Sequence, residues 1–492
     1  MSISHTVRTQ AFIDGQFVDA EGGATFENLN PATGQLLNRV AACSEQDVDR
    51  AVQSARRVFQ SGVWSRMEPR ERKRILRRFS DLIEANGDEI ALLDSVDAGK
   101  PISDCKNIDI PDVVNNIRWY AEAIDKVFGK VAPTGADKLG LVVREAVGVI
   151  GLVLPWNFPA GTLSWKISPA LAAGNSIVVK PAELAPLSTL RIAELATEAG
   201  IPPGVFNVVP GLGHIAGKAL GLHPDVDVIS FTGSTEVGRH FLRYAADSNL
   251  KKVVLECGGK SPQIVMADAA DRLEAIADNL AGAAFWNMGQ NCTCGSRILV
   301  QSSIKEQFIE QLAKAARQWT VGQPGDPEAR LGPLIEASAL ARVLSAIDQA
   351  KKDGASVVTG GKQVMMDTGG WFVEPTIIVN VDPSSAIATH EVFGPVVVVI
   401  SFDTEEDAIR IANESSYGLA ATLFTNDVNV AIRVSRQIQA GTVAVNGYGE
   451  GDITTPFGGY KTSGFGGYDK GMEAFDQYTQ LKTIYISLDL KN

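Results

Sequence analysis

Runs of apolar residues alternate with segments of helical periodicity through the middle of the chain. The apolar runs VGVIGLVLP, SIVVKP, VFNVVPG, VDVISFTGS and KKVVLECGG are bounded by Gly, Pro or polar residues and separated by segments such as STLRIAELATEAG. Strand–helix–strand repeats of this kind predict a parallel sheet with crossover helices. Because the runs have no polar face, we expect both faces of this sheet to be covered.

The rest of the chain predicts further elements. Residues 1–40 read as short strands and turns, with a hairpin at Asp14-Gly15. Helical spacing follows from Glu45 to about Asn86, and a separate helix is expected over 110–125. Residues 261–446 alternate again and predict a second α/β unit. The tail at 480–490 alternates as one strand, which is a natural pairing element for another subunit.

Composition narrows the class of protein. The chain has 492 residues, 45 Lys and Arg against 57 Asp and Glu, and a net charge of −12, which disfavours nucleic acid as a partner. Its longest apolar stretch, 146–154, is too short to cross a bilayer, so we expect no membrane partner. The five cysteines include no CxxC pair, so no metal site is predicted. With no signal pattern at the N-terminus, we expect a cytoplasmic protein.

Two glycine-rich turns compete for a nucleotide phosphate. Gly211 to Gly217 follows one strand, and Gly233 with Ser234 links another strand to a helix. Taken alone, either is equally well a tight turn without a ligand. Lys180 and Glu183 follow the strand SIVVK, where a carboxylate can accept ribose hydroxyls, although a surface ion pair explains them too.

Two further residues have the chemistry of a reactive centre. Cys292 is flanked by Gln290, Asn291 and Thr293, which suits a nucleophile of lowered pKa better than a core cysteine. Glu256 follows the run KKVVL and could be a general base of raised pKa. The alternatives are a buried inert thiol and a loop or helix-capping carboxylate.

Together these motifs resemble one family. PWNFP, KPAE, FTGSTEVG, LECGGKSP, GQNC, EVFGP and PFGGYK occur in this order. The chain resembles the NAD(P)-dependent aldehyde dehydrogenases over nearly its full length. The resemblance implies an α/β fold with a Rossmann-like parallel-sheet cofactor domain, an α/β catalytic domain and a small β oligomerisation segment. The implied limits are 1–125 and 146–257 for the cofactor domain, 258–455 for the catalytic domain, 126–145 and 474–492 for the oligomerisation segment, and 456–473 for a return to the domain interface.

The resemblance also implies the site residues. Cys292 would be the nucleophile, Glu256 the general base, and Asn157 the side-chain donor of the oxyanion hole, a contribution on the order of 3 kcal/mol. The product of attack and hydride transfer to the nicotinamide would be a Cys292 thioester, which Glu256 hydrolyses with an activated water. The implied cofactor-binding residues are Trp156, Lys180, Glu183, Gly233, Ser234, Glu391 and Phe393.

Three positions depart from the family pattern. Cys257 stands where Leu is usual, and Cys294 follows the nucleophile by two residues. Cys294 is expected to be a small buried side chain, with a reversible link to Cys292 as the alternative. In Gly466-Gly467-Tyr468-Asp469, Tyr468 is expected to occupy the position of an acid that relays protons, with Asp469 adjacent.

The substrate is suggested by a branch of the family. The segments 110–125 and 449–453 resemble the bacterial aminoaldehyde dehydrogenases, including those for gamma-glutamyl-aminobutyraldehyde and guanidinobutyraldehyde. Asp109 and Asp112 lie one helical turn apart and could hold a cationic end, although acids are common in a first turn. The predicted substrate-pocket residues are Asp109, Asp112, Phe158, Trp165, Trp286 and Glu450, with the two tryptophans stacking on the cation.

Several alternatives stay open. Arylacetaldehydes and aliphatic aldehydes are other substrates, and NAD is favoured over NADP because Glu183 would repel a 2′-phosphate. Outside this class, the chain could be a thiol hydrolase or a non-catalytic relative. Its five histidines form no recognisable Cys/His signature. The expected partners are a small aldehyde and further copies of the chain, as a homo-oligomeric dimer or tetramer.

Overall fold

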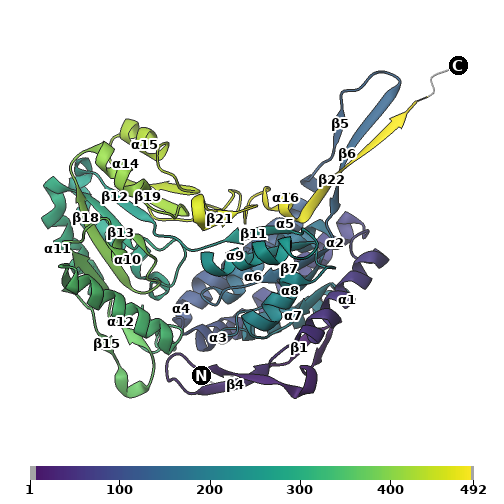
Figure 1. Cartoon of the computed structure of the whole chain (residues 1–492), viewed down its shortest axis with the longest axis horizontal. Helices are drawn as coiled ribbons and strands as arrows, with labels where there is room; N and C mark the ends of the chain where they lie inside the picture. The colour runs from purple at the N-terminus through teal and green to yellow at the C-terminus, as the bar shows by residue number, and fades with distance from the viewer. Residues whose placement is uncertain (1–6, 489–492) are drawn as a thin grey trace.

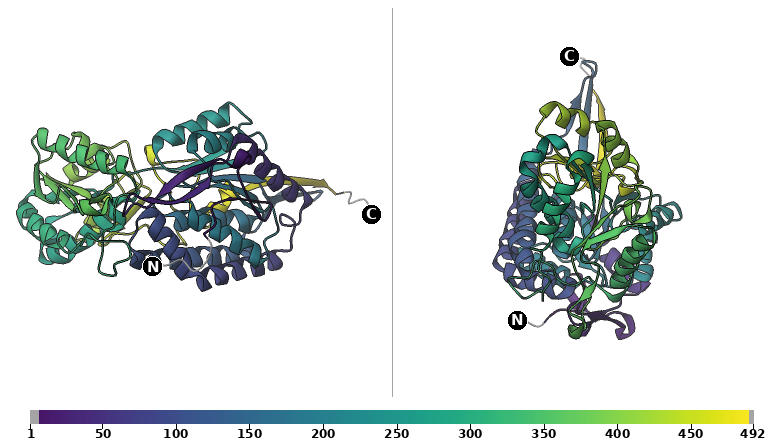
Figure 2. Two further views of the ribbon diagram at one scale, coloured as in Figure 1. Left: turned by 90° about the horizontal axis from the view of Figure 1, so that it is seen from below. Right: turned by 90° about the vertical axis from the view of Figure 1, so that its left-hand side faces the viewer.

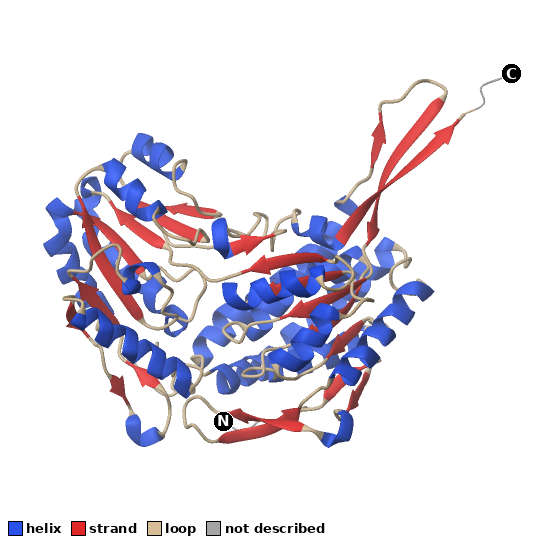
Figure 3. Cartoon of the chain, in the orientation of Figure 1, coloured by secondary structure: helices blue, strands red, loops and turns tan. Residues whose placement is uncertain are grey.

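The computed structural model describes residues 7–488 and is built around two large sheets, each with a parallel centre and helices against it (Figures 1 and 3). The first sheet has the order β2-β1-β9-β8-β7-β10-β11-β21, and its central strands β9, β8, β7, β10 and β11 are parallel. All five predicted strands are therefore confirmed. The strands of this sheet are β1 (Ala11–Ile13), β2 (Gln16–Val18), β7 (Val149–Val153), β8 (Ser176–Lys180), β9 (Phe206–Val208), β10 (Val228–Thr232), β11 (Lys252–Glu256) and β21 (Gly464–Phe465).

Alternate residues of these strands enter two different cores. Ile150 and Leu152 of β7 pack in the core beneath α2, α5, α6 and α7, whereas Val149 and Val153 pack in the core beneath α1, α8 and α9. The covered faces explain the uniformly apolar runs. The helices of this part are α1 (Glu45–Ser61), α2 (Pro69–Ala85), α3 (Gly87–Ala98), α4 (Ile102–Asp104), α5 (Ile110–Ala123), α6 (Pro159–Ala173), α7 (Leu187–Ala199), α8 (Lys218–Leu222) and α9 (Thr235–Ala246).

The second sheet has the order β14-β17-β18-β13-β12-β19-β20, with only β14 antiparallel to its neighbour. The second α/β region of the sequence is thus confirmed. Its strands are β12 (Pro262–Val265), β13 (Arg297–Gln301), β14 (Ser356–Thr359), β17 (Thr376–Val379), β18 (Val396–Phe402), β19 (Ala420–Phe424) and β20 (Thr442–Val445). Its helices are α10 (Leu273–Phe285), α11 (Lys305–Ala316), α12 (Ala337–Lys352), α13 (Ala386–Thr389), α14 (Glu405–Asn413) and α15 (Val428–Ser435).

A three-stranded antiparallel sheet projects from the body of the molecule (Figures 1 and 2). It consists of β5 (Lys130–Ala132), β6 (Lys138–Ala146) and β22 (Thr479–Ser487), and α16 (Ala474–Tyr478) leads into it. The predicted C-terminal strand is confirmed up to Ser487, whereas its expected last residues, 489 and 490, lie outside the described part. Smaller two-stranded sheets are β3 (Thr25–Leu29) with β4 (Leu36–Ala41) and β15 (Gln363–Val364) with β16 (Phe372–Val373).

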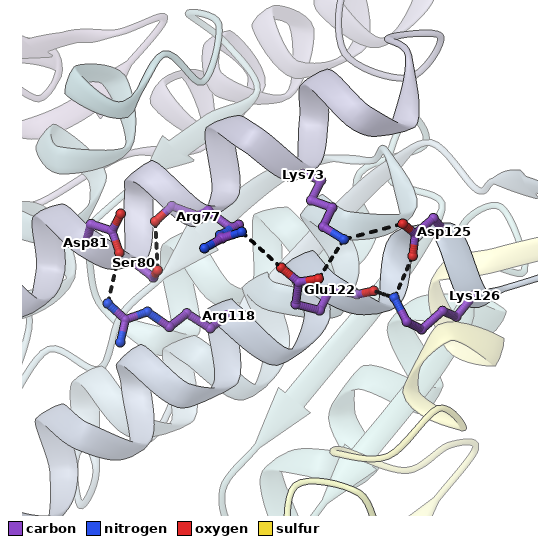
Figure 4. A network of polar contacts seen from close by, with 8 residues as sticks. All are labelled: Lys73, Arg77, Ser80, Asp81, Arg118, Glu122, Asp125 and Lys126. Atoms are coloured by element: carbon purple, nitrogen blue, oxygen red, sulfur yellow. Dashed lines mark hydrogen bonds and ion pairs between the residues drawn. The ribbon is translucent and has the colours of Figure 1, made fainter.

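Most basic residues of α2 face solvent, whereas Arg72 is buried and donates to the Trp64 carbonyl oxygen at 3.2 Å. Lys73 contacts Glu122 and Asp125 at 2.6 and 3.3 Å, and Arg118 of α5 reaches back to Asp81 at 2.8 Å (Figure 4). Exposed pairs of this kind contribute little individually. Together with the apolar contacts beneath them, they hold α2 against α5, whose first turn faces the site. Between residues 7 and 488, none of the helices combines the length and the apolar character needed to span a bilayer.

Candidate active site

The site lies at the carboxyl ends of the first sheet, next to the switch point of its strand order. The central strands lie in the order β9-β8-β7-β10-β11. The chain therefore adds β8 and β9 on one side of β7, and then β10 and β11 on the other side. Ligands of open α/β sheets bind at such a crevice. Asn157 follows β7, Ser234 follows β10, and Glu256 is the last residue of β11. Parallel strands therefore bring three of the predicted site residues to one edge.

One cavity of about 890 Å³ opens at this edge, lined by the first sheet with its loops and by segments that connect elements of the second α/β region, including residues 286, 291–292, 391, 393 and 448–451. Fourteen predicted site residues reach it, whereas Lys180 and Glu183 do not. These fourteen are Asp109, Asp112, Trp156, Asn157, Phe158, Trp165, Gly233, Ser234, Glu256, Trp286, Cys292, Glu391, Phe393 and Glu450.

Cys292 lies in a loop between α10 and β13 that polar contacts hold in place. Asn287 has a positive φ of 52°, and its Nδ2 donates to the carbonyl oxygens of Asn157 and Gln290 at 3.0 and 2.9 Å. The Gln290 side chain accepts from the Ile335 N–H at 3.0 Å. These bonds explain why the polar residues around the thiol are buried, and they leave Cys292 partly open to the cavity.

The pKa of Cys292 differs from the sequence expectation. Burial raises it well above its ordinary value, and the carboxylates of Glu450, Glu391 and Glu256 raise it further. The polar sequence around the thiol suggested a lowered pKa. Those neighbours instead hold the loop, and the residues that surround the sulfur are acidic. In this state the thiol retains its proton at neutral pH.

Asn157 is placed as a donor beside the Cys292 loop. Its Nδ2 donates to the Gln290 carbonyl at 3.0 Å, which orients the amide and leaves its second N–H available. The side chain is 6% exposed and lines the cavity with Cys292. Lys100 Nζ donates to the Asn157 carbonyl oxygen at 3.4 Å, and this hydrogen bond also helps to fix the backbone of Asn157.

Glu256 ends β11 with its carboxylate buried. Within residues 7–488, neither of its side-chain oxygens has a hydrogen-bond partner. Burial raises the pKa of Glu256 well above its ordinary value, Asp469 raises it further, and Lys166 opposes the shift. A carboxyl that is 3% exposed, lines the cavity and has a raised pKa is suited to general base chemistry.

The sequence placed Tyr468 at the position of an acid that relays protons, but in the structure the next residue, Asp469, takes that position. Asp469 is the buried acid: it is 1% exposed, lines the cavity and pairs with Lys166 at 2.9 Å. Tyr468 is 45% exposed. The turn at residues 466–471 contains three positive φ angles, so spacing along the chain does not determine which side chain faces Glu256.

Cys294 behaves as the small buried side chain that the sequence favoured. It is 6% exposed, and its Sγ–H donates to the Ala284 carbonyl at 3.4 Å. That contact directs the sulfur toward α10 rather than into the cavity. Cys257, where the family usually has Leu, is buried with a pKa raised to about 12, mainly by burial.

The side of the cavity next to α9 fits a dinucleotide. Ser234 caps α9 by accepting the Val237 N–H at 3.3 Å, and it lines the cavity together with Gly233. The N-terminus of a helix at this place is suited to a phosphate group. Glu391 accepts from the Gly259 N–H at 3.0 Å, and a Cβ on Gly258 would lie 2.2 Å from its Oε2. Burial raises the pKa of Glu391 to about 7. Trp156 and Phe393 form an edge contact at 5.3 Å beside it.

Lys180 and Glu183 form a pair at the same sheet edge, outside the lining of the cavity. Their charged atoms are 2.5 Å apart, and Glu183 also accepts the Gly213 N–H at 3.3 Å. Burial acts to raise the pKa of Glu183, but Lys180 and the hydrogen bonds hold it below its ordinary value. Because Lys180 is only 2% exposed, the lysine of this ion pair is buried in the protein, and the pair is not a surface ion pair. Glu183 therefore carries its negative charge at neutral pH.

Two of the predicted substrate contacts are already engaged within the protein. Asp109 pairs with the buried Lys100 at 2.6 Å, so it is not free for a substrate cation. Trp165 has Lys470 over its ring at 4.0 Å, so this face is not open for stacking. Sequence reasoning found neither lysine, because no local motif marks them and only the packing of distant segments brings them to these positions.

Asp112 and Glu450 remain as acids at the cavity. Asp112 accepts the Trp165 indole N–H at 2.8 Å, and Glu450 accepts the Thr293 hydroxyl at 2.6 Å. The Thr293 hydroxyl also lies 2.7 Å from that of Tyr448, a residue that the sequence analysis missed. Phe158 and Trp286 pack together at 5.2 Å, with Lys100 over the Phe158 ring at 3.9 Å.

The aldehyde dehydrogenase family model matches residues 17–484. The chain belongs to the aldehyde dehydrogenase family, and the prediction of this family and of an oxidoreductase that acts on aldehydes is confirmed. An aminoacetaldehyde dehydrogenase of Pseudomonas aeruginosa is 53% identical over 477 residues, with 97% of this chain and 95% of that protein covered.

Two solved structures share the fold almost entirely. The gamma-glutamyl-gamma-aminobutyraldehyde dehydrogenase of Burkholderia cenocepacia J2315 has a TM-score of 0.96 and 51% identity, covering 99% of this chain and 98% of its own. The P. syringae indole-3-acetaldehyde dehydrogenase AldA, in complex with NAD+ and IAA, has a TM-score of 0.97 and 49% identity, with 99% and 98% covered. The predicted fold class and the resemblance to the aminoaldehyde branch are thereby confirmed.

Proposed function

We propose that this enzyme oxidises an aldehyde to a carboxylic acid with NAD, through a thioester on Cys292. The observation that carries the proposal is the convergence of Cys292, Asn157 and Glu256 on one cavity whose α9 side fits a dinucleotide. The P. syringae relative was solved with NAD+, which supports the same cofactor here.

The chain's own residues divide the chemistry. The Cys292 thiol gives its proton to solvent in the cavity, and its sulfur attacks the aldehyde carbon to form a thiohemiacetal. Asn157 Nδ2–H and the Cys292 backbone N–H stabilise the oxyanion. Bound NAD supplies the two-electron acceptor. The oxidised carbon is then a thioester, and Glu256 removes a proton from the water that hydrolyses it.

The test is an aldehyde panel followed at the absorbance of the reduced cofactor, with NAD and NADP compared. We expect turnover with an aldehyde and a higher kcat/KM for NAD, because the charged Glu183 repels a 2′-phosphate. A thiol hydrolase or a non-catalytic relative would give no reduced cofactor. Equal kcat/KM for the two cofactors would refute the role given to Glu183.

For the substrate, we propose an ω-aminoaldehyde. Asp112 and Glu450 place two carboxylates around the cavity, and neither is neutralised by an ion pair within residues 7–488. A carboxylate in a partly buried tunnel favours a cationic group over an uncharged one. The two aminoaldehyde-oxidising relatives support this class.

Asp112→Asn tests the role of this acid, because it removes the charge and keeps an oxygen for the Trp165 N–H. We expect the kcat/KM ratio of 5-aminopentanal to pentanal to fall by about tenfold. Asp367→Asn, exposed and outside the lining of the cavity, is the matched control for the loss of one negative charge. An unchanged ratio in Asp112→Asn would rule out the acidic pocket.

Arylacetaldehydes are the second candidate class. Phe158 and Trp286 offer an apolar wall, and the P. syringae relative is an indole-3-acetaldehyde dehydrogenase. A higher kcat/KM for phenylacetaldehyde than for 5-aminopentanal would favour this class.

We also propose the domain limits implied by the resemblance, a homo-oligomer and a cytoplasmic location. The projecting sheet supports the oligomer, because Leu481 and Tyr485 of β22 expose 65% and 60% of their surface, and Phe128, just before β5, exposes 77%. An edge strand with apolar side chains is suited to pairing with a second copy.

A further inference from the structure

Lys470 places an ammonium group in the wall of the cavity. Its Nζ lies 4.0 Å from the centroid of the Trp165 ring and 5.7 Å from that of Phe457, and the residue is 6% exposed. Among residues 7–488, no carboxylate oxygen lies within 4.0 Å of it and no acceptor takes its hydrogens. An aromatic face attracts an ammonium group, but it leaves the N–H donors of that group free for an anion in the cavity.

Neither the acid next to Lys470 in sequence nor an acid that its charge influences forms an ion pair with it. Asp469 precedes it directly, but its carboxylate pairs with the buried Lys166 at 2.9 Å. The pKa of Asp452 is lowered mainly by hydrogen bonds from Thr454 and only last by Lys470, and Asp452 is exposed and lies outside the lining of the cavity. The Lys470 ammonium is therefore an unpaired cation facing the space that a substrate would enter.

The backbone at Lys470 is also unfavourable for a lysine. Its φ is 59°, a left-handed conformation that long side chains rarely adopt, and Gly471 follows at 62°. Glycine or asparagine would be better suited to this turn. Strain of this kind concentrates at functional sites, where the side chain is needed at that place.

The indole of Trp165 contacts both the Lys470 ammonium and the carboxylate of Asp112. The Trp165 N–H donates to Asp112 Oδ2 at 2.8 Å, while the Trp165 ring carries the Lys470 ammonium. One negative and one positive group thus lie against the same side chain. In a tunnel that binds only a cationic substrate, the positive charge of Lys470 would be unfavourable, because it repels that substrate.

We propose that Lys470 is a specificity-determining residue that binds an anionic group, a carboxylate, on the part of the aldehyde remote from its reacting carbon. This inference rests on the proposed function, since it concerns the cavity of Cys292. The ammonium then gains the partner that the protein does not supply, and Asp112 remains available for an amino group on the same substrate.

The test uses three aldehydes of one chain length: 5-oxopentanoate, pentanal and 5-aminopentanal. In the wild-type enzyme, we expect a higher kcat/KM for 5-oxopentanoate than for pentanal. Lys470→Met should lower the ratio of these two values by about tenfold or more. Lys470→Arg should retain the preference. Lys352→Met, at the exposed end of α12, is the matched control for the loss of one positive charge.

The outcomes separate this inference from the aminoaldehyde proposal. If the wild type oxidises 5-oxopentanoate no better than pentanal, or if Lys470→Met lowers kcat/KM for both equally, the role of Lys470 is refuted. Because the first comparison needs no variant, a Lys470→Met protein that fails to fold does not remove the test. Poor oxidation of 5-aminopentanal alone would refute the aminoaldehyde substrate and leave Lys470 standing.

Discussion

Cys292→Ala is expected to lower kcat/KM for aldehyde oxidation by at least roughly 10³-fold, because no other thiol reaches the reacting position. Of the five cysteines, only Cys257 also lines the cavity, and its burial raises its pKa to about 12. The substitution removes a partly exposed side chain from a loop that Asn287 and Gln290 hold independently. The protein should therefore fold normally and still bind the cofactor.

Cys294→Ala is the matched control in the same loop. Its thiol points at the Ala284 carbonyl, so we expect activity close to that of the wild type. Initial rates at the absorbance of the reduced cofactor measure both variants. A Cys292→Ala enzyme as fast as the Cys294→Ala enzyme would contradict the role of Cys292 as nucleophile.

Glu256→Gln is expected to lower the steady-state rate by about 10²–10⁴-fold while leaving the first oxidation in place. Glutamine keeps the size of the side chain but cannot accept a proton from water. Rapid mixing should then show a burst of reduced cofactor of about one equivalent per site, followed by slow turnover. A uniformly slow reaction without a burst would place Glu256 before the thioester instead.

The pH dependence of hydrolysis follows from the same carboxyl. Burial and Asp469 raise the pKa of Glu256, so a larger fraction of it is protonated at neutral pH than in an ordinary glutamate. The base form increases as pH rises, and the wild-type hydrolysis rate should increase with it. The Glu256→Gln enzyme should lose this dependence on Glu256.

The strands, and the site residues that follow them directly, could be predicted from the hydrophobic pattern of the sequence. Uniform apolar runs marked strands such as β7 and β8, and parallel pairing then requires Asn157, Ser234 and Glu256 to meet at one edge. The arrangement of the dinucleotide side follows from the same rule, because the turn after β10 precedes a helix N-terminus.

Residues whose roles depend on distant packing were not predictable. Asp109 looked like a partner of Asp112 at helical spacing, but Lys100 neutralises it. The acid beside Glu256 was placed at Tyr468 instead of Asp469, because left-handed residues in that turn change which side chains point inward. The pKa of Cys292 depends on Glu450 and Glu391, which lie far along the chain and enter through the fold.

The central claim is that the aldehyde carbon becomes bonded to the sulfur of Cys292. The most direct measurement is mass spectrometry of the Glu256→Gln enzyme, quenched in acid after mixing with NAD and pentanal. The account predicts one pentanoyl group per chain, located on the peptide that contains Cys292 and absent from the Cys292→Ala protein. An unmodified Cys292 peptide during the burst, or an acyl group on another residue, would contradict it.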